Sequence, residues 1–175
     1  TGASPDLVLV AGSSMERYSA QMTLDARENK FVEIALSEAR LGLEEGGIPI
    51  GACLVVDDKV LGRGHNRRIQ QGNPILHGEM DALTNAGRQP AEVYQRATMF
   101  TTLSPCAMCT GAILLYKIPR VVLLENETFQ GEEELLRSRG VEVVALDLAE
   151  AKELMAEFQR RHPDVWREDI GERDK

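Results

Sequence analysis

Cysteine and long apolar runs are both scarce in this sequence. Its 175 residues include only three cysteines, Cys53, Cys106 and Cys109, and an odd, low count gives no disulfide framework. The longest early apolar stretch, Leu7 to Ala11, is too short to cross a membrane, and no basic segment leads into it as in a signal peptide. We therefore expect a soluble cytoplasmic protein with no membrane partner.

Positive charge is scarce as well. The chain carries 20 Lys and Arg against 28 Asp and Glu, which gives a formal net charge of −8. Binding to a phosphate backbone depends on clustered Lys and Arg. The dense clusters here are short, with Arg63, Arg67 and Arg68 in one and Arg160 and Arg161 in the other. We therefore expect a small uncharged substrate and no nucleic-acid partner.

The length fits one ordinary domain, because typical domains have about 100–150 residues. Helix-like and strand-like patterns alternate from about residue 28 onwards, as they do in α/β domains. We expect residues 1–26 to be an N-terminal extension that is partly foreign to the natural gene product. Residues 27–175 are expected to form the functional domain, with a lid-forming tail at the C-terminus.

Hydrophobic periodicity predicts five helices and five strands within this domain. The expected helices cover residues 32–43, 77–86, 106–117, 132–139 and 149–161, and the expected strands 50–56, 60–66, 97–102, 120–124 and 141–146. This order predicts a three-layer α/β/α domain with a mixed sheet of about five strands flanked by helices. After the last helix, Pro163 is expected to release an extended tail.

Two short segments at expected helix starts carry residues with the chemistry of a metal site. They are HGE at residues 77–79 and PCAMC at residues 105–109. Zinc binds imidazole nitrogen and thiolate sulfur, and a catalytic zinc site keeps one of its four positions for water. We therefore predict one Zn²⁺ per chain, held by His77, Cys106 and Cys109, with a water or hydroxide as the fourth ligand.

Glu79 is predicted to be the catalytic proton carrier and not a metal ligand. Zinc lowers the pKa of its bound water to about 7, and a carboxylate within reach can accept that proton and pass it on. The spacing H-x-E followed by P-C-x-x-C is typical of zinc deaminases that act on bases. Alternatives are a redox pair of Cys106 and Cys109 or a zinc-binding scaffold without activity. His77 and Glu79 argue against the redox pair, and Glu79, which does not coordinate the metal, argues against the scaffold.

Several longer stretches extend the pattern beyond the zinc motif. They run from about Phe31 to Glu172 and include EGGIPIGACLV, VLGRGHNRRIQ, LHGEM, TTLSPCAMCTGAI, IPRVV, ENETF and WREDIGE. In these stretches the chain resembles the fungal-type cytosine deaminases of the cytidine deaminase superfamily. The resemblance implies a cytidine deaminase-like fold, a homodimer, and the hydrolysis of free cytosine to uracil and ammonia. Glu79 would move the protons in that reaction.

The resemblance also implies a set of polar groups around the base. Asn66 and the backbone of Gly78 would hydrogen-bond the polar edge of the ring. The backbone carbonyl of Ser104 and the carboxylate of Asp169 would receive the exocyclic amino group. An acceptor at Asp169 would favour a base that presents an amino group.

The aromatic wall and lid of the pocket would be formed by Phe129, Trp166 and Ile170. Arg167 departs from the fungal pattern, which has an aromatic residue there, so the substrate stays open. The alternatives are isocytosine, creatinine or a guanine-like ring, and a tRNA adenosine deaminase activity. The tRNA enzymes normally have alanine at the position of Gly78 and rely on a basic surface, so the acidic balance argues against that activity.

Overall fold

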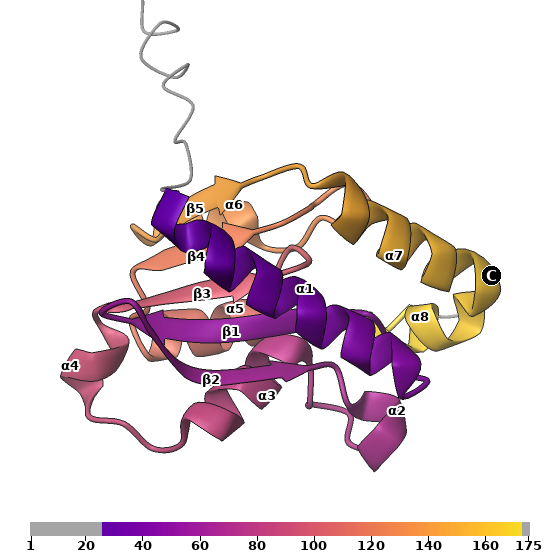
Figure 1. Cartoon of the computed structure of the whole chain (residues 1–175), viewed down its shortest axis with the longest axis horizontal. Helices are drawn as coiled ribbons and strands as arrows, with labels where there is room; N and C mark the ends of the chain where they lie inside the picture. The colour runs from indigo at the N-terminus through magenta and orange to yellow at the C-terminus, as the bar shows by residue number, and fades with distance from the viewer. Residues whose placement is uncertain (1–25, 173–175) are drawn as a thin grey trace, which may run out of the picture.

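The computed structural model describes residues 26–172 and arranges them as a central sheet between helices (Figure 1). The expected N-terminal extension lies outside the described residues except for Ala26. Within residues 26–172 the sheet has five strands in the order β2-β1-β3-β4-β5. The predicted three-layer α/β/α fold is confirmed.

The sheet is mixed, and both of its antiparallel pairs involve β1. It pairs antiparallel with β2 and β3, whereas the β3–β4 and β4–β5 pairs are parallel. The β1–β2 hairpin turns at Asp57 and Asp58, whose positive φ angles of 49° and 61° suit the tight turns of right-twisted hairpins. All five predicted strands are confirmed to within one residue at each end. They are β1 (Gly51–Val56), β2 (Lys59–His65), β3 (Ala97–Thr101), β4 (Arg120–Leu123) and β5 (Glu142–Ala145).

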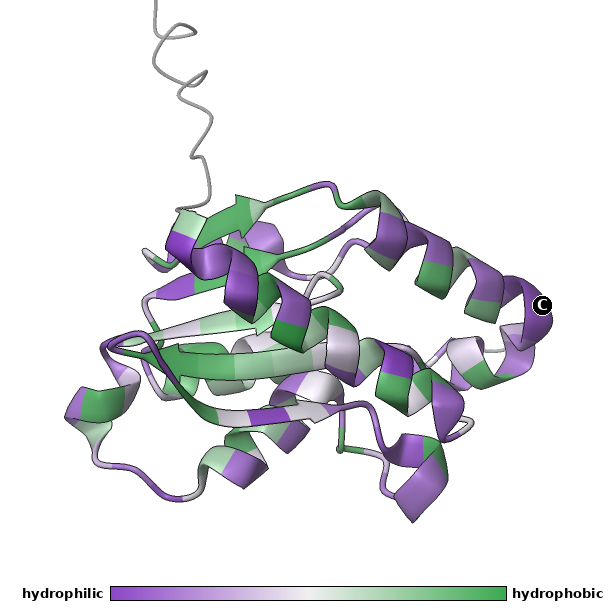
Figure 2. Cartoon of the chain, in the orientation of Figure 1, coloured by the Kyte–Doolittle hydropathy of each residue, from purple (hydrophilic) through white to green (hydrophobic). Residues whose placement is uncertain are grey.

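Helices cover both faces of the sheet because side chains alternate along the strands. Ala52 and Leu54 of β1 pack with α3, α5 and α6 on one face, while Cys53 and Val55 pack with α1 on the other. Figure 1 shows α1 in front of the sheet with α3 and α5 behind it, and the central strands are largely apolar in Figure 2. The helices in the described part of the chain are η1 (Ala26–Glu28), α1 (Asn29–Glu44), α2 (Arg68–Gln71), α3 (Gly78–Ala86), α4 (Ala91–Tyr94), α5 (Ala107–Leu115), α6 (Glu133–Ser138), α7 (Ala149–Arg161) and α8 (Pro163–Asp169).

The C-terminal tail differs from its prediction. Pro163 does not release an extended segment, because it is the first residue of α8. Proline suits the first helical position, where its missing N–H loses no hydrogen bond and its fixed φ is already helical. The single-turn helices α2 and α4 were also not predicted, since four residues are too few to show a helical period. None of the helices in residues 26–172 is long and apolar enough to span a membrane.

Candidate active site

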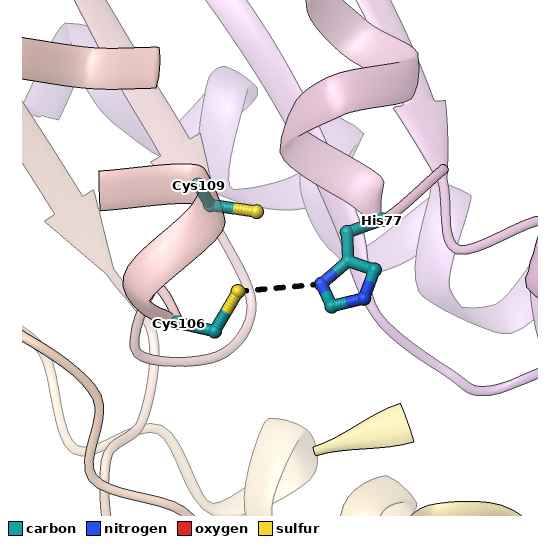
Figure 3. Close-up of side chains that lie close together, drawn as sticks. All are labelled: His77, Cys106 and Cys109. Atoms are coloured by element: carbon teal, nitrogen blue, oxygen red, sulfur yellow. Dashed lines mark hydrogen bonds between the residues drawn. The ribbon is translucent and has the colours of Figure 1, made fainter. Parts of the chain in front are cut away.

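The starts of α3 and α5 bring one histidine and two cysteines together (Figure 3). β2 and β3 both run antiparallel to β1, so their C-terminal ends lie at the same edge of the sheet. The chain leaves this edge towards α3, capped by His77, and α5, capped by Cys106. Each helix therefore begins one residue later than predicted, and Cys109 follows within the first turn of α5.

This cluster has the dimensions of a metal site. One ligand atom from each of His77, Cys106 and Cys109 lies within 4.8 Å of the others. His77 Nδ1 is 3.5 Å from Cys106 Sγ, and this hydrogen bond is drawn in Figure 3. Imidazole nitrogen and thiolate sulfur form a donor set that suits zinc.

The two sulfurs of the cluster differ in charge. A hydrogen bond from Cys109 lowers the pKa of Cys106 to about 4, although burial opposes the shift. The same hydrogen bond, together with burial, raises the pKa of Cys109 well above its ordinary value. The cluster therefore already contains one thiolate at neutral pH. Cys53, in contrast, is buried in β1, and burial raises its pKa to about 12, so it remains a neutral core thiol.

Glu79 lies buried in the first turn of α3, directly beside the cysteines. Its Oε2 accepts a hydrogen bond from Cys109 Sγ at 3.3 Å, and its Oε1 accepts one from Thr101 Oγ1 at 3.0 Å. Burial and the nearby negative charge of Cys106 raise the pKa of this carboxyl group. Thr101 therefore orients the Glu79 carboxyl group, and the raised pKa favours its protonated form.

Asp169, at the end of α8, approaches His77 from the other side. His77 Nε2 is 3.5 Å from Asp169 Oδ1, while Nδ1 faces Cys106. Burial lowers the pKa of His77, but the hydrogen bond to Cys106 and the charge of Asp169 outweigh it and raise that pKa. A carboxylate on the far nitrogen of a metal-binding histidine determines its tautomer and ring orientation.

Asn66 joins the same carboxylate from the end of β2. Its side chain is buried, and its Nδ2 donates to Asp169 Oδ1 at 3.3 Å. Gly78 stands beside Ile50, where an added Cβ would lie 2.9 Å from the Ile50 carbonyl oxygen. This close approach accounts for glycine at residue 78.

A small cavity opens between these groups. About 20 Å³ of free space remains in it, which is room for about one water molecule. The cavity is lined by most of the predicted site residues, namely His77, Glu79, Ser104, Cys106, Phe129, Trp166, Asp169 and Ile170, together with Ile50 and Leu103. The predicted site residues Asn66, Gly78 and Cys109 do not line the cavity. A larger groove of about 800 Å³ runs along α7, but none of the predicted site residues lines it.

Aromatic side chains close the cavity. Phe129 and Trp166 meet edge to face, with ring centroids 5.6 Å apart and an interplanar angle of 84°. Ile170 packs against the same apolar cluster. Arg167 does not line the cavity, and it donates to Asp164 at 3.5 Å on the exposed side of α8. The departure from the fungal pattern at Arg167 therefore lies on the outside of α8.

Sequence reasoning missed three residues that hold the site in place. Thr101 orients Glu79, and Arg68 donates to Asp169 Oδ1 at 3.1 Å. Glu133, which is buried, accepts a hydrogen bond from Ser104 Oγ at 2.9 Å. Thr101 and Glu133 carry no signal in the sequence. In the sequence Arg68 is noticeable only as part of a short basic cluster, whereas in the structure it pairs with Asp169.

This combination of fold and side chains places the protein in the class of zinc-dependent deaminases, which are hydrolytic enzymes. Residues 25–125 match the family model for the cytidine and deoxycytidylate deaminase zinc-binding region. A cytosine deaminase of Candida albicans is 55% identical over 152 residues, which is 86% of this chain and 100% of the relative. The chain therefore belongs to the cytidine and deoxycytidylate deaminase family.

Relatives with other activities share this family. A tRNA-specific adenosine deaminase of Streptococcus pyogenes is 39% identical over 107 residues, covering 60% of this chain and 67% of the relative. A structure solved in a study of A-to-I editing by tRNA:A34 deaminases has a TM-score of 0.63 and 29% identity. The match covers 72% of this chain and 99% of that one. Family membership alone does not choose the substrate.

Proposed function

We propose that this protein hydrolyses free cytosine to uracil and ammonia. The observation that carries the proposal is that Glu79, beside Cys109, and Asp169, beside His77, line the same small cavity. We assign proton transfer to Glu79 and acceptance of an exocyclic amino group to Asp169. The Candida albicans relative supports the choice of base, because it matches over its whole length and is a cytosine deaminase.

We infer that His77, Cys106 and Cys109 hold one Zn²⁺ per chain, with water as the fourth ligand. The cluster offers three protein ligands, as catalytic zinc sites do. When bound, zinc supplies a Lewis acid and a water of lowered pKa. Cys106 is already a thiolate, and Cys109 would lose its proton on coordination.

Glu79 moves the protons of the proposed reaction. Thr101 holds Oε1, so Oε2 faces the cluster and can take the proton of the attacking water. The raised pKa of this buried carboxyl group keeps the proton available for return. Glu79 would deliver it to the ring nitrogen beside the attacked carbon, and would then carry a second proton to the leaving amine.

Asp169 and the backbone carbonyl of Ser104 are proposed to accept the amino group, while Asn66 and the Gly78 backbone bind the polar edge. Phe129, Trp166 and Ile170 would cover the ring faces. Because the cavity has room for about one water molecule, these apolar side chains must move before a base can enter. Their closure over the bound base would then exclude water.

The test is ammonia release from a panel of cytosine, isocytosine, creatinine, guanine, adenine, cytidine and a tRNA stem-loop. We expect cytosine to give the highest kcat/KM and the purified protein to contain about one zinc per chain, as a three-ligand catalytic site requires. If another compound of the panel gives a higher kcat/KM, cytosine is not the preferred substrate and the proposal is wrong on this point. Full activity of zinc-free protein would reject the mechanism.

We also infer that two chains form a homodimer. Several large apolar side chains are exposed in the described part of the chain, and Leu115 (73%) and Ile75 (55%) are the most accessible of them. Exposed apolar patches on a globular domain mark surfaces that bind other proteins. Light scattering after gel filtration should give the mass of two chains, and a monomer at micromolar concentration would contradict the inference.

A further inference from the structure

Arg68 contacts both polar side chains proposed to face the base. It begins α2, and its backbone N–H donates to Asn66 Oδ1 at 3.1 Å. Its guanidinium NH1 donates to Asp169 Oδ1 at 3.1 Å. Because Asn66 Oδ1 is occupied by Arg68, its Nδ2 is directed to Asp169, where it donates at 3.3 Å. One residue therefore orients an amide and a carboxylate.

Arg68 also supplies charge that Asp169 needs. The Asp169 side chain is only 2% exposed, and a carboxylate out of water requires a paired cation or several hydrogen bonds. A histidine that binds zinc is neutral, so His77 can donate a hydrogen bond to Asp169 without compensating its charge. The Arg68 side chain, 13% exposed, is the cation in contact with it.

The same contact joins two elements that are distant in sequence. Asp169 is the last residue of α8, and Trp166 of that helix lines the cavity. Arg68 lies 101 residues earlier, in α2. Within residues 26–172 its Nε is buried and has no hydrogen-bond partner, so this side of the guanidinium is out of contact with water. The contact therefore connects the rim of the site to the helix that closes it.

The contacts of Asp169 all involve one of its two carboxylate oxygens, which leaves the other oxygen for a ligand. Asn66, Arg68 and His77 all meet its Oδ1. No other side chain of the described residues forms a hydrogen bond or ion pair with the second oxygen, Oδ2, so it can accept from a ligand amino group. These three contacts fix the orientation of the carboxylate, so Arg68 and its neighbours determine the direction in which its second oxygen faces the ligand.

We propose that Arg68 is a positioning residue: its contact with Asp169 holds α8 over the cavity and orients the carboxylate that binds the amino group of the base. The identity of the base rests on the proposed function, whereas the closure of α8 by Arg68 does not. Arg68 itself does not line the cavity, so its effect reaches the substrate through Asp169 and Asn66.

Trp166 allows the closure to be measured without substrate, because it is the single tryptophan of the chain. In Arg68→Gln we expect acrylamide to quench Trp166 fluorescence more strongly, with zinc content unchanged. KM for cytosine should rise about 10-fold or more, because a buried charge loses its partner, while kcat changes less than about threefold. Arg68→Lys keeps the positive charge but loses the planar guanidinium group, so its KM and its quenching should lie between those of the parent protein and those of Arg68→Gln.

Two control variants separate this role from general charge loss. Glu168→Gln removes the other acid near Arg68, at 3.4 Å, whose side chain is 75% exposed. Arg96→Gln removes the same charge from an exposed pair with Asp57. Both should leave KM and quenching as in the parent protein. Unchanged quenching and KM in Arg68→Gln, or equal effects in either control, would overturn the proposal. If the parent protein deaminates another base instead, the proposed substrate fails while the quenching result still decides the role of Arg68.

Discussion

At the scale of single residues, the surroundings of a side chain decide its chemistry. Cys106 and Cys53 are the same residue type, yet the pKa is about 4 for Cys106 and about 12 for Cys53. The first receives hydrogen bonds at a helix start, while the second is buried among apolar side chains. Glu79 follows the same rule, because burial raises its pKa towards the range in which it can exchange protons.

Glu79→Gln tests the proton transfer directly. Glutamine has nearly the same volume and can still accept from Thr101, so zinc binding and folding should be unaffected. It cannot take a proton from water, so kcat should fall by about 100- to 10,000-fold. Metal analysis and ammonia release measure the two effects separately. Retained turnover would remove Glu79 from the mechanism, and loss of zinc would make the variant uninformative about proton transfer and assign Glu79 to the metal site.

At the scale of elements, the site depends on how closely α3 packs on the sheet. A Cβ added at Gly62 of β2 would lie 2.2 Å from the Ala82 carbonyl oxygen and 2.3 Å from the Ala86 nitrogen. Both atoms belong to the backbone of α3, which cannot yield as a flexible side chain would. Since α3 starts beside His77 and carries Glu79, its distance from β2 sets the position of both.

Gly62→Ala should therefore destabilise the fold by about 1–3 kcal/mol or more, because an added methyl group forces the helix away from the strand. Urea unfolding followed by circular dichroism measures the change. Lys59→Ala, at an exposed position of the same strand, is the matched control and should stay within about 0.5 kcal/mol. A Gly62→Ala protein as stable as its parent would show that α3 can move on the sheet.

At the scale of the whole molecule, distant segments meet at one point. His77 and Cys106 come from helices on one face of the sheet, whereas Asp169 comes from the C-terminal helix. Zinc would join the starts of α3 and α5, and Arg68 joins α2 to α8. Metal binding should therefore stabilise the folded chain as a whole.

Removal of zinc by a chelator should lower the Tm, measured by calorimetry under reducing conditions. A ligand that binds only the folded state adds about 2.7 kcal/mol at a concentration of 100 Kd. Addition of Zn²⁺ should restore the Tm and the activity, while Mg²⁺ should not, because sulfur ligands do not suit it. An equal Tm with and without zinc would contradict a metal site that links the two helices.

Much of the fold could be predicted because its evidence is local. The strand β1 is a run of apolar residues, and α7 shows a helical period from Ala149 to Arg161. The sequence does not reveal the role of Pro163, because proline is compatible both with the end of one helix and with the first position of the next. In the folded chain Trp166 and Val165 of this helix pack in the apolar cluster that includes Ile50 and Leu103 of the cavity lining.

The sequence by itself identified the candidate reactive groups, because His77 and Glu79 followed by Cys106 and Cys109 match the spacing of a deaminase motif. Tertiary structure brought His77 to Cys106, which is 29 residues away. Tertiary structure alone decided how these groups are held and closed in. Thr101 reaches Glu79, and Arg68 reaches Asp169, only after segments 22 and 101 residues apart have packed together. Such contacts leave no periodicity or motif, because they depend on the relative placement of whole elements and not on local backbone geometry.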